Sequence, residues 1–477
     1  MNSNSSSRPT RRRFLGGAGA ALAAAPYLKS QGAEKRPNLI FLLTDDQRWD
    51  ALGCMGNPIV RTPHVDAMAA DGVLFTNNFV TTSICMTSRA SFFSGLYARS
   101  HGIVDFSTSF TKEQFARTYP QVLRAAGYRT GFIGKWGVGK QMPRDDFDYF
   151  AGFPGQGHYF PNRPDTSPHL TELMGDQSLE FLDGSGPGQP FCLQVSFKAP
   201  HVQDQDPRQF LYAPALRSLY RDAEIPVPKT ADPRFISMLP IEVQRSEGRR
   251  RWAVRFSTPA LYQESVKSYY RLITEVDTVV GRIRDRLRRM KADDNTVIVY
   301  AGDNGFYLSE HGLAGKWFMH EESIRTPLVI HDPRLPADAR GRRRPEMTLN
   351  IDVAPTLLSL AGVQLPEMQG RDLSPLVRGG SPAWRSEWFY EHLFEHPWIP
   401  QTEGVRTESW KFTRYLNTKP PFEELFDLAA DPLEEHNLVS RAAHRQRYES
   451  LKERWRRWRT ALETWRPGSR FQEPPAG

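Results

Sequence analysis

Apolar runs alternate along the chain with amphipathic stretches that end at glycine. The first run, RPNLIFLLTDD (36–46), is apolar until two acids end it, which is typical of a strand buried on both faces. The stretch TPHVDAMAADG then predicts a helix with Thr62 as N-cap, Pro63 at its first position and Gly72 at its end. The same alternation predicts a helix and strand in YPQVLRAAGYRTGFIGKW, strands at QPFCLQVSF, NTVIVYAGDNG and TPLVIHD, and helices at 262–290 and IDVAPTLLSLAG.

This alternation predicts an α/β fold with a large, mostly parallel sheet sandwiched by helices. The Pro-rich stretch 199–259 lacks clear periodicity, so we expect an insertion that lies over the site. After about residue 374 the pattern changes to short strand-like pieces and a final Trp/Arg-rich helix. We therefore predict a main domain over 36–374 and a smaller α+β domain over 375–477, a division that suits 477 residues.

The chain is basic, with a formal net charge of +8, which favours anionic partners. Its cations are spread out, although RSEGRRRWAVR (245–255) and RIRDRLRRMK (282–291) concentrate them. Acids interleave the second run at helical spacing, which is typical of a solvated helix face. Neither run belongs to a nucleic-acid-binding motif, so we do not expect nucleic acid as a partner.

The first 33 residues are interpreted as a targeting segment. TRRRFLGGAGAALAAAP (10–26) has paired arginines before a short small-apolar stretch and resembles a bacterial twin-arginine export signal. The alternative is a disordered basic tail. On the first interpretation the export machinery is a partner, cleavage falls between residues 25 and 35, and the mature chain is periplasmic or extracellular. No other segment is apolar enough to span a membrane, so no membrane association is expected after processing.

Three cysteines, Cys54, Cys85 and Cys192, cannot form a disulfide framework, although one pair with one remaining thiol is conceivable. Cys85 lies in SICMTSRASFFSGL, ahead of Arg89 and what we interpret as a serine-rich turn. Nothing in the composition says what a lone cysteine does there.

Polar residues end several apolar runs: the pair Asp45–Asp46, Lys135, His201 and the pair Asp303–Asn304. Functional groups in open α/β sheets collect at the carboxyl ends of strands, so we expect these side chains to meet. The oxygen donors suit Ca²⁺ or Mg²⁺, whereas the His and Cys spacings of a zinc site are absent.

Three cations, Lys135, Lys316 and Arg89, are candidates to hold an oxyanion near that metal. Lys135 is followed by Trp136 and not by Ser or Thr, which excludes a Walker-type phosphate loop. His201 is a candidate general acid, although a lone histidine is more often structural.

Taken together, these motifs resemble the type I sulfatase family of the alkaline phosphatase superfamily. The resemblance runs from about residue 37 to 438 and includes NLIFLLTDDQRWDALGCMGN, TPHVDAMAADGVLFTNNFV, CMTSRASFFSGLYARSHGI, GYRTGFIGKW, GDNGFYLSEHGLAGKW, IDVAPTLLSLAGV and ELFDLAADPLEEHNL. It implies that 36–374 is a sulfatase catalytic domain.

The resemblance also implies that a formylglycine-generating enzyme oxidises Cys85 to Cα-formylglycine (3-oxoalanine), whose hydrated aldehyde is the nucleophile. By position, the implied metal ligands are Asp45, Asp46, Asp303, Asn304 and modified Cys85. The implied catalytic roles are stabilisation of the nucleophile by Arg89, sulfate binding by Lys135 and Lys316, and contact with the sulfate or protonation of the leaving alcohol by His201.

Two positions depart from the family pattern. Thr87 stands where the modification motif usually has Pro or Ala, and Gly137 stands where the family often has a histidine that assists breakdown of the sulfated intermediate. The candidates to replace that histidine are His101, His311 and His320. We hypothesise His311, because it lies between the predicted metal-ligand loop and Lys316.

The substrate is expected to be a sulfated carbohydrate, since the sequence looks most like N-acetylglucosamine-6-sulfatases and other glycosaminoglycan sulfatases. Trp136, Tyr159 and Trp317 are compatible with a sugar platform. Aryl sulfate and choline sulfate stay open as substrates. The alternatives in function are a phosphodiester or phosphonate monoester hydrolase of the same superfamily, and a non-catalytic protein that binds sulfated glycans.

Overall fold

The structure is a computed structural model that describes residues 36–161, 168–186, 188–364 and 366–475. The predicted export signal therefore lies outside the described residues. Within them, nine strands form the main sheet, and only β9 runs against its neighbours. In spatial order the strands are β10 (Arg342–Arg344), β2 (Val73–Phe79), β9 (Arg325–His331), β6 (Thr296–Gly302), β1 (Asn38–Asp45), β5 (Phe191–Pro200), β3 (Arg129–Lys135) and β4 (Tyr149–Phe153), with β11 (Thr348–Leu349) beside β2.

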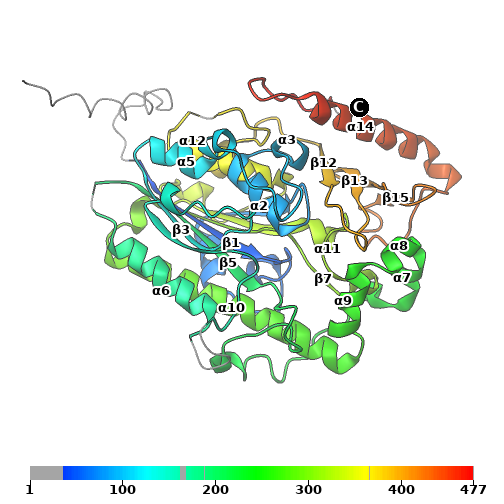
Figure 1. The fold of residues 1–477 in the computed structure, drawn as a ribbon, viewed down its shortest axis with the longest axis horizontal. Coiled ribbons are helices and arrows are strands. Elements are labelled where there is room, and N and C mark those ends of the chain that lie inside the picture. The colour runs from blue at the N-terminus through cyan, green and yellow to red at the C-terminus, as the bar shows by residue number, and fades with distance from the viewer. Residues whose placement is uncertain (1–35, 162–167, 187, 365, 476–477) are drawn as a thin grey trace, which may run out of the picture.

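Helices cover both faces of this sheet, as predicted (Figure 1). Side chains alternate along β1, so that Leu39, Phe41 and Leu43 belong to one core cluster while Ile40 and Leu42 belong to another. The first cluster is completed by α2 (Cys85–Ser94), α5 (Tyr119–Ala125) and α12 (Val353–Leu360), and the second by α1 (Pro63–Asp71), α6 (Leu170–Asp183) and α10 (Pro259–Arg289). Burial on both faces explains why the central strands are apolar throughout.

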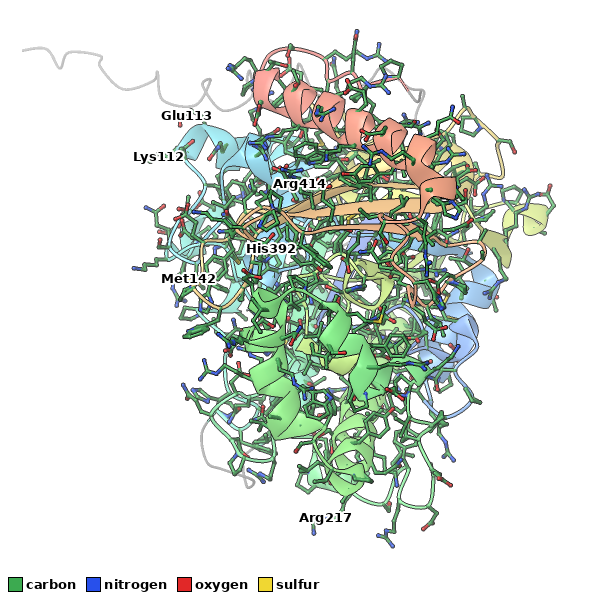
Figure 2. The ribbon with its side chains drawn as sticks, turned by 90° about the vertical axis from the view of Figure 1, so that its right-hand side faces the viewer. Lys112, Glu113, Met142, Arg217, His392 and Arg414 are labelled. Atoms are coloured by element: carbon green, nitrogen blue, oxygen red, sulfur yellow. The ribbon has the colours of Figure 1, made fainter. Side chains whose placement is uncertain are left out.

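A second, antiparallel sheet follows near the C-terminus and confirms a smaller α+β unit. Its strands, in order, are β12 (Glu387–His392), β13 (Thr402–Thr407), β14 (Trp410–Tyr415) and β15 (Glu423–Asp427). Helix α14 (Arg445–Thr464) packs its buried Trp455 and Trp458 against this sheet. Figure 2 shows α14 on one side of the sheet and the short helices of the predicted insertion on the other.

The stretch 199–259 is not structureless. It forms α7 (Pro233–Met238), α8 (Ile241–Gln244) and α9 (Glu247–Arg255), and its last residue already begins α10. Side chains of α9 line the cavity at Cys85, as expected for an insertion over the site. The remaining short elements are α3 (Ala98–His101), α4 (Lys112–Ala116), β7 (Tyr307–Leu308), β8 (Ala314–Gly315), α11 (Glu321–Ile324) and α13 (Ser374–Val377).

The predicted ends of helix α1 are confirmed, with Thr62 as N-cap, Pro63 as first residue and Gly72 after the last. The Thr62 hydroxyl makes no capping bond, since it accepts from Gly53 N and donates to Asp66. One local prediction was wrong. Cys85 does not precede a turn, because the serine-rich stretch is helix α2. Among the described residues, no helix combines the length and apolar character needed to cross a membrane.

Candidate active site

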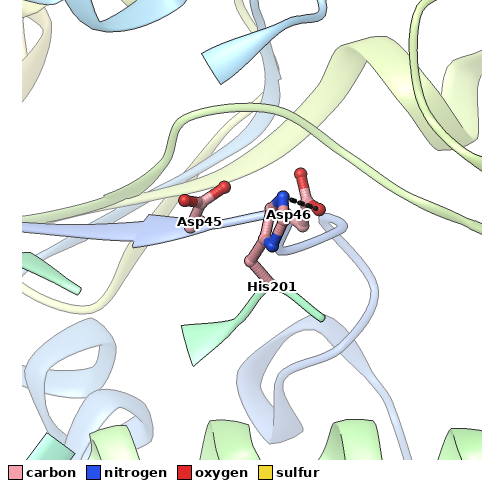
Figure 3. A group of neighbouring side chains, drawn as sticks. All are labelled: Asp45, Asp46 and His201. Atoms are coloured by element: carbon pink, nitrogen blue, oxygen red, sulfur yellow. Dashed lines mark ion pairs between the residues drawn. The ribbon is translucent and has the colours of Figure 1, made fainter. Parts of the chain in front are cut away.

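The carboxyl ends of β1 and β5 bring the first site residues together (Figure 3). Asp45 is the last residue of β1, and Asp46 follows with a φ of 65°, a left-handed conformation that aspartate tolerates better than most residues. His201 follows β5 directly, and its Nε2 lies 3.6 Å from an oxygen of Asp46. One ligand atom from each of these three residues lies within 4.8 Å of the others, as a shared metal ion would require.

Two lysines from other strand ends meet these carboxylates. Lys135, at the end of β3, places Nζ 2.5 Å from Asp45 Oδ2 and also donates to Gln156 Oε1 at 2.6 Å. Lys316 follows the β7–β8 hairpin and forms an ion pair with Asp46, with its Nζ 3.9 Å from Asp45 Oδ1. Both lysines are buried, so their ammonium groups are available only to partners within the site.

Arg89 reaches the same point from α2, one helical turn after Cys85. Its guanidinium donates to Asp303 Oδ2 at 2.9 Å and lies 3.2 Å from Asp45 Oδ2. It also donates to the Lys135 carbonyl and the Ser196 hydroxyl, at 2.8 and 2.6 Å. These four partners hold the guanidinium in one orientation.

Cys85 is the first residue of α2 and is only 2% exposed, yet it lines a cavity. All three cysteines are free, so the conceivable disulfide does not form. Because helix N-termini favour negative charge, Cys85 has an environment suited to an anionic group. We refer below to the inner site, made of Asp45, Asp46, Cys85, Arg89, Lys135, Asp303, Asn304 and Lys316.

Charges in the inner site balance: three carboxylates face Arg89, Lys135 and Lys316. Burial raises the pKa of Asp303 to about 7, an effect that the negative charge of Asp45 reinforces. Burial would also raise the pKa of Asp45, but the charges of Lys135, Arg89 and Lys316 hold it below its ordinary value. A further cation would therefore be stabilised beside Asp303.

Two buried oxygens support a metal at this point. Asp45 Oδ1 and Asn304 Oδ1 make no hydrogen bond to any described residue, although buried polar atoms are normally paired. The Asn304 amide is oriented by its Nδ2, which donates to Asp46 Oδ1 at 2.6 Å and to the Gly305 carbonyl at 2.9 Å. Carboxylate and amide oxygens are the donors that Ca²⁺ and Mg²⁺ prefer, so the residues present fit such an ion.

A buried lysine that the sequence analysis did not single out supports His201. Lys198 Nζ donates to the Val202 carbonyl at 2.9 Å, and His201 Nδ1 shares that same oxygen at 2.7 Å. His201 Nδ1 therefore carries the hydrogen, and its Nε2 faces Asp46. Burial, and then the charges of Lys316, Lys135 and Lys198, lower the pKa of His201 well below its ordinary value, so the ring is neutral.

A cavity of about 550 Å³ opens from the inner site. Cys85, His201, Lys316 and Gln156 line its inner end. Its mouth, which we call the outer rim, comprises Phe106, Asp204, Glu247, Arg250, Arg251, Trp317, Phe394, His396, Trp398 and Ile399.

The structure does not bring His311 together with the cavity. Its ring stacks on that of His320 with centroids 4.2 Å apart, and the Tyr307 hydroxyl bonds His320 Nδ1 at 2.7 Å. The third candidate, His101, lies against Ser91 at 3.1 Å. Among the described residues, none of these three histidines lines the cavity.

Gly137, the position of the missing histidine, instead packs against the inner site. Its φ is 72°, and a Cβ there would lie 2.8 Å from Arg89 Cδ and 3.6 Å from Lys135 Cε. Glycine thus leaves the space in which the Arg89 side chain reaches Asp303.

Of the three residues compatible with a sugar platform, one lines the cavity. Trp317 lines the cavity, whereas Trp136 belongs to the apolar core and the buried Tyr159 donates to the His201 carbonyl. The sequence analysis missed Gln156 and Ser196, which carry no motif signal. It gave the basic run 245–255 no role beyond its place in the predicted insertion, although Arg250 and Arg251 line the outer rim.

Known proteins share this architecture. The sulfatase family model matches residues 37–363, and the model for the C-terminal part of N-sulphoglucosamine sulphohydrolase matches residues 309–461. An N-acetylglucosamine-6-O-sulfatase of Bacteroides thetaiotaomicron is 30% identical over 91% of this chain and 88% of its own length. Human N-acetylglucosamine-6-sulfatase is 25% identical over 76% of this chain and 68% of its own.

Solved structures of similar proteins share this fold. One determined in complex with its substrate, D-glucosamine-2-N,6-O-disulfate, superposes with a TM-score of 0.80 at 25% identity, covering 91% of this chain and 99% of that chain. The phosphonate monoester hydrolase of Agrobacterium radiobacter shares the fold with a TM-score of 0.76 at 23% identity, covering 90% and 96%. On these matches the chain belongs to the sulfatase family and is a sulfuric ester hydrolase.

Proposed function

We propose that this chain is an exported sulfatase that hydrolyses a sulfate ester of a carbohydrate, with a nucleophile made from Cys85. The observation that carries the proposal is the position of Cys85 at the buried end of a cavity, among three cations and four oxygen-bearing side chains. That combination suits transfer of a tetrahedral oxyanion, because fixed positive charges stabilise the negative charge of its oxygens.

The charged side chains and the histidine around Cys85 would each have a separate role. Lys316 lines the cavity and would bind the sulfate oxygens, together with Lys135 behind it. Arg89 would stabilise the charge on the group at position 85, which lies one helical turn before it in α2. His201 is neutral with a lone pair on Nε2, so it would accept the proton that the hydroxyl nucleophile at position 85 releases and pass it to the leaving alcohol oxygen.

Two further groups complete the proposal. Asp45, Asp46, Asp303 and Asn304 would hold Ca²⁺ or Mg²⁺, which when bound polarises a sulfate oxygen. Formylglycine at position 85 would supply a hydroxyl nucleophile beside that cation, made by a separate formylglycine-generating enzyme. Cys85 fits this conversion because it lies beside the cations and faces the cavity.

A carbohydrate is the proposed substrate because sulfated sugars are named for several relatives, including the Bacteroides and human N-acetylglucosamine-6-sulfatases. The cavity is also much larger than one sulfate group. Export rests on the twin-arginine-like sequence, which would place the mature enzyme in the periplasm or outside the cell.

The test is to express the chain with a formylglycine-generating enzyme and to measure the mass of the tryptic peptide that contains Cys85. We expect the aldehyde or its hydrate, and sulfate release from a sulfated sugar by the metal-loaded protein. An unmodified thiol together with tight binding of sulfated glycans would support a binding protein instead. Faster turnover of a phosphate diester or phosphonate monoester than of any sulfate ester would support the phosphoryl alternative.

A further inference from the structure

The outer rim joins two parts of the chain that are far apart in sequence. The backbone N–H of Glu247, at the start of α9, donates to the Trp398 carbonyl at 2.9 Å. The Arg250 guanidinium lies over the Trp398 ring, 5.9 Å from its centroid. The predicted insertion and the C-terminal unit therefore form one continuous wall of the cavity.

Aromatic rings gather on this wall in unusual exposure. Trp398 is 48% exposed and Phe106 is 45% exposed, although both are large apolar side chains. Phe394 contacts Phe106 edge-on with centroids 5.5 Å apart and stacks on His396 at 5.6 Å. Exposed rings at the mouth of a cavity mark a ligand surface, and the C–H face of a pyranose packs on such rings.

The charged side chains of the outer rim are already paired with one another. Glu247 accepts from Arg251 Nε at 2.9 Å and from Arg250 at 3.3 Å. Asp204 lies 3.4 Å from Arg251 and 2.7 Å from Arg255. Among the residues that line the rim, Asp204 and Glu247 balance Arg250 and Arg251, while Arg255, which shares Asp204, is only 1% exposed and does not line the cavity.

This balance has a consequence for the ligand. A second anionic group on the substrate would meet guanidinium groups that are already paired with carboxylates, and it would approach those two carboxylates. A hydroxyl group both donates and accepts, so it can bond to an arginine and its paired acid together. The wall is therefore suited to an uncharged, hydroxyl-rich ring.

We propose that the outer rim is a subsite for one pyranose ring whose only charged group is the sulfate to be removed, with Trp398 as its platform and the α9 charge pairs as its hydroxyl partners. The proposal rests on the proposed function, since the inner site must receive the sulfate. It names Trp398 and Arg250 as specificity-determining residues that take no part in the chemistry.

The test measures binding to a Cys85→Ala background, which separates recognition from turnover. Inorganic sulfate, N-acetylglucosamine 6-sulfate and glucosamine 2-N,6-O-disulfate would be titrated calorimetrically. We expect the monosulfated sugar to bind at least about tenfold more tightly than inorganic sulfate, and Trp398→Ala to remove that advantage without changing the affinity for inorganic sulfate. We expect the disulfated sugar to bind no more tightly than the monosulfated one.

Arg250→Ala provides a second variant with a matched control. Arg456 in α14 is also exposed and also pairs with a glutamate three residues earlier, but it lies on another part of the molecule. Arg250→Ala should weaken the monosulfated sugar several-fold, whereas Arg456→Ala should not. Disulfated sugar that binds about tenfold more tightly, and loses this gain in Arg250→Ala, would show an anion subsite and overturn the proposal. Sulfate binding with no gain for either sugar would overturn the subsite alone, and loss of all three would overturn the proposed function too.

Discussion

The inner site and the outer rim are built from different kinds of structure. Every residue of the inner site is at most 3% exposed, and most end or follow strands of one sheet. The outer rim comes from loops and short helices, with rings up to 48% exposed. The difference indicates that the reaction depends on a rigid sheet edge, whereas the choice of substrate depends on surface segments that can vary.

The comparison predicts the largest effect for Cys85, the source of the proposed nucleophile. Cys85→Ala should lower turnover of every sulfate ester by at least about a thousandfold, since no other group can replace the nucleophile. Cys192→Ala is a matched control, because Cys192 is also free and buried but lies in the core. Steady-state kinetics of both variants would measure this, and a Cys85→Ala enzyme that keeps its turnover would contradict the assignment.

The second largest loss of turnover is expected on removal of the proposed metal ion. Dialysis against a chelator should lower turnover by at least about a hundredfold, and Ca²⁺ or Mg²⁺ should restore it. The same ion should raise the melting temperature of the chelated protein, because it neutralises crowded buried carboxylates. Asp46→Asn should abolish the thermal shift, so an unchanged shift in that variant would place the ion elsewhere.

Gly137→Ala tests how rigid the inner site is. The new Cβ would lie 2.8 Å from Arg89 Cδ at a φ of 72°. Gly102→Ala is the control, since Gly102 has a φ of 73° and a Cβ there would meet no atom of the described residues within 4 Å. Both variants should lose about 1 kcal/mol of stability from backbone strain, but only Gly137→Ala should lower kcat, by about tenfold. Equal kinetics for the two would show that Arg89 tolerates displacement.

Lys198→Met tests whether Lys198 helps to orient His201. Lys198 and His201 Nδ1 both donate to the Val202 carbonyl. Without Lys198 this carbonyl is held less firmly, so it orients the His201 ring less well. We expect kcat to fall by about tenfold with little change in KM, and the pH profile of kcat to shift. Lys267→Met removes a half-buried lysine, away from the cavity, that also donates to a carbonyl, and it should leave both parameters unchanged. A change in KM alone would point to substrate binding instead.

The smallest catalytic effect is expected at His311. Burial, together with the charge of Lys411, lowers its pKa to about 3, below the unfolded value, so the unfolded chain binds more protons below about pH 6.5. Its contribution to stability is therefore complete above that pH and decreases by about 2 kcal/mol between pH 7 and 5. His311→Asn, which suits the left-handed φ of 53°, should reduce this pH dependence and leave kcat unchanged. Denaturation at both pH values would measure it, with exposed His436→Asn as control; a large loss of kcat would restore His311 to the reaction.

The inner site was easier to predict from the sequence than the outer rim. Continuous apolar runs ending in acids placed Asp45, Asp46, Asp303 and Asn304 at one sheet edge, because burial on both faces leaves a strong local signal. Tyr159 was misjudged because its hydroxyl group donates to a residue distant in the chain, the carbonyl of His201. Of the outer rim, the sequence predicted only the insertion and Trp317, since the rim residues come together only through the packing of segments far apart in the chain.

The contact between Glu247 and Trp398 uses only backbone atoms. Substitution of either side chain, except Glu247 by proline, keeps the donor and the acceptor, so the wall can persist while its surface changes. Sequence drift at these positions can then produce enzymes with new preferences from an unchanged scaffold. The same property makes the two segments suitable positions for combinatorial libraries that retarget the enzyme.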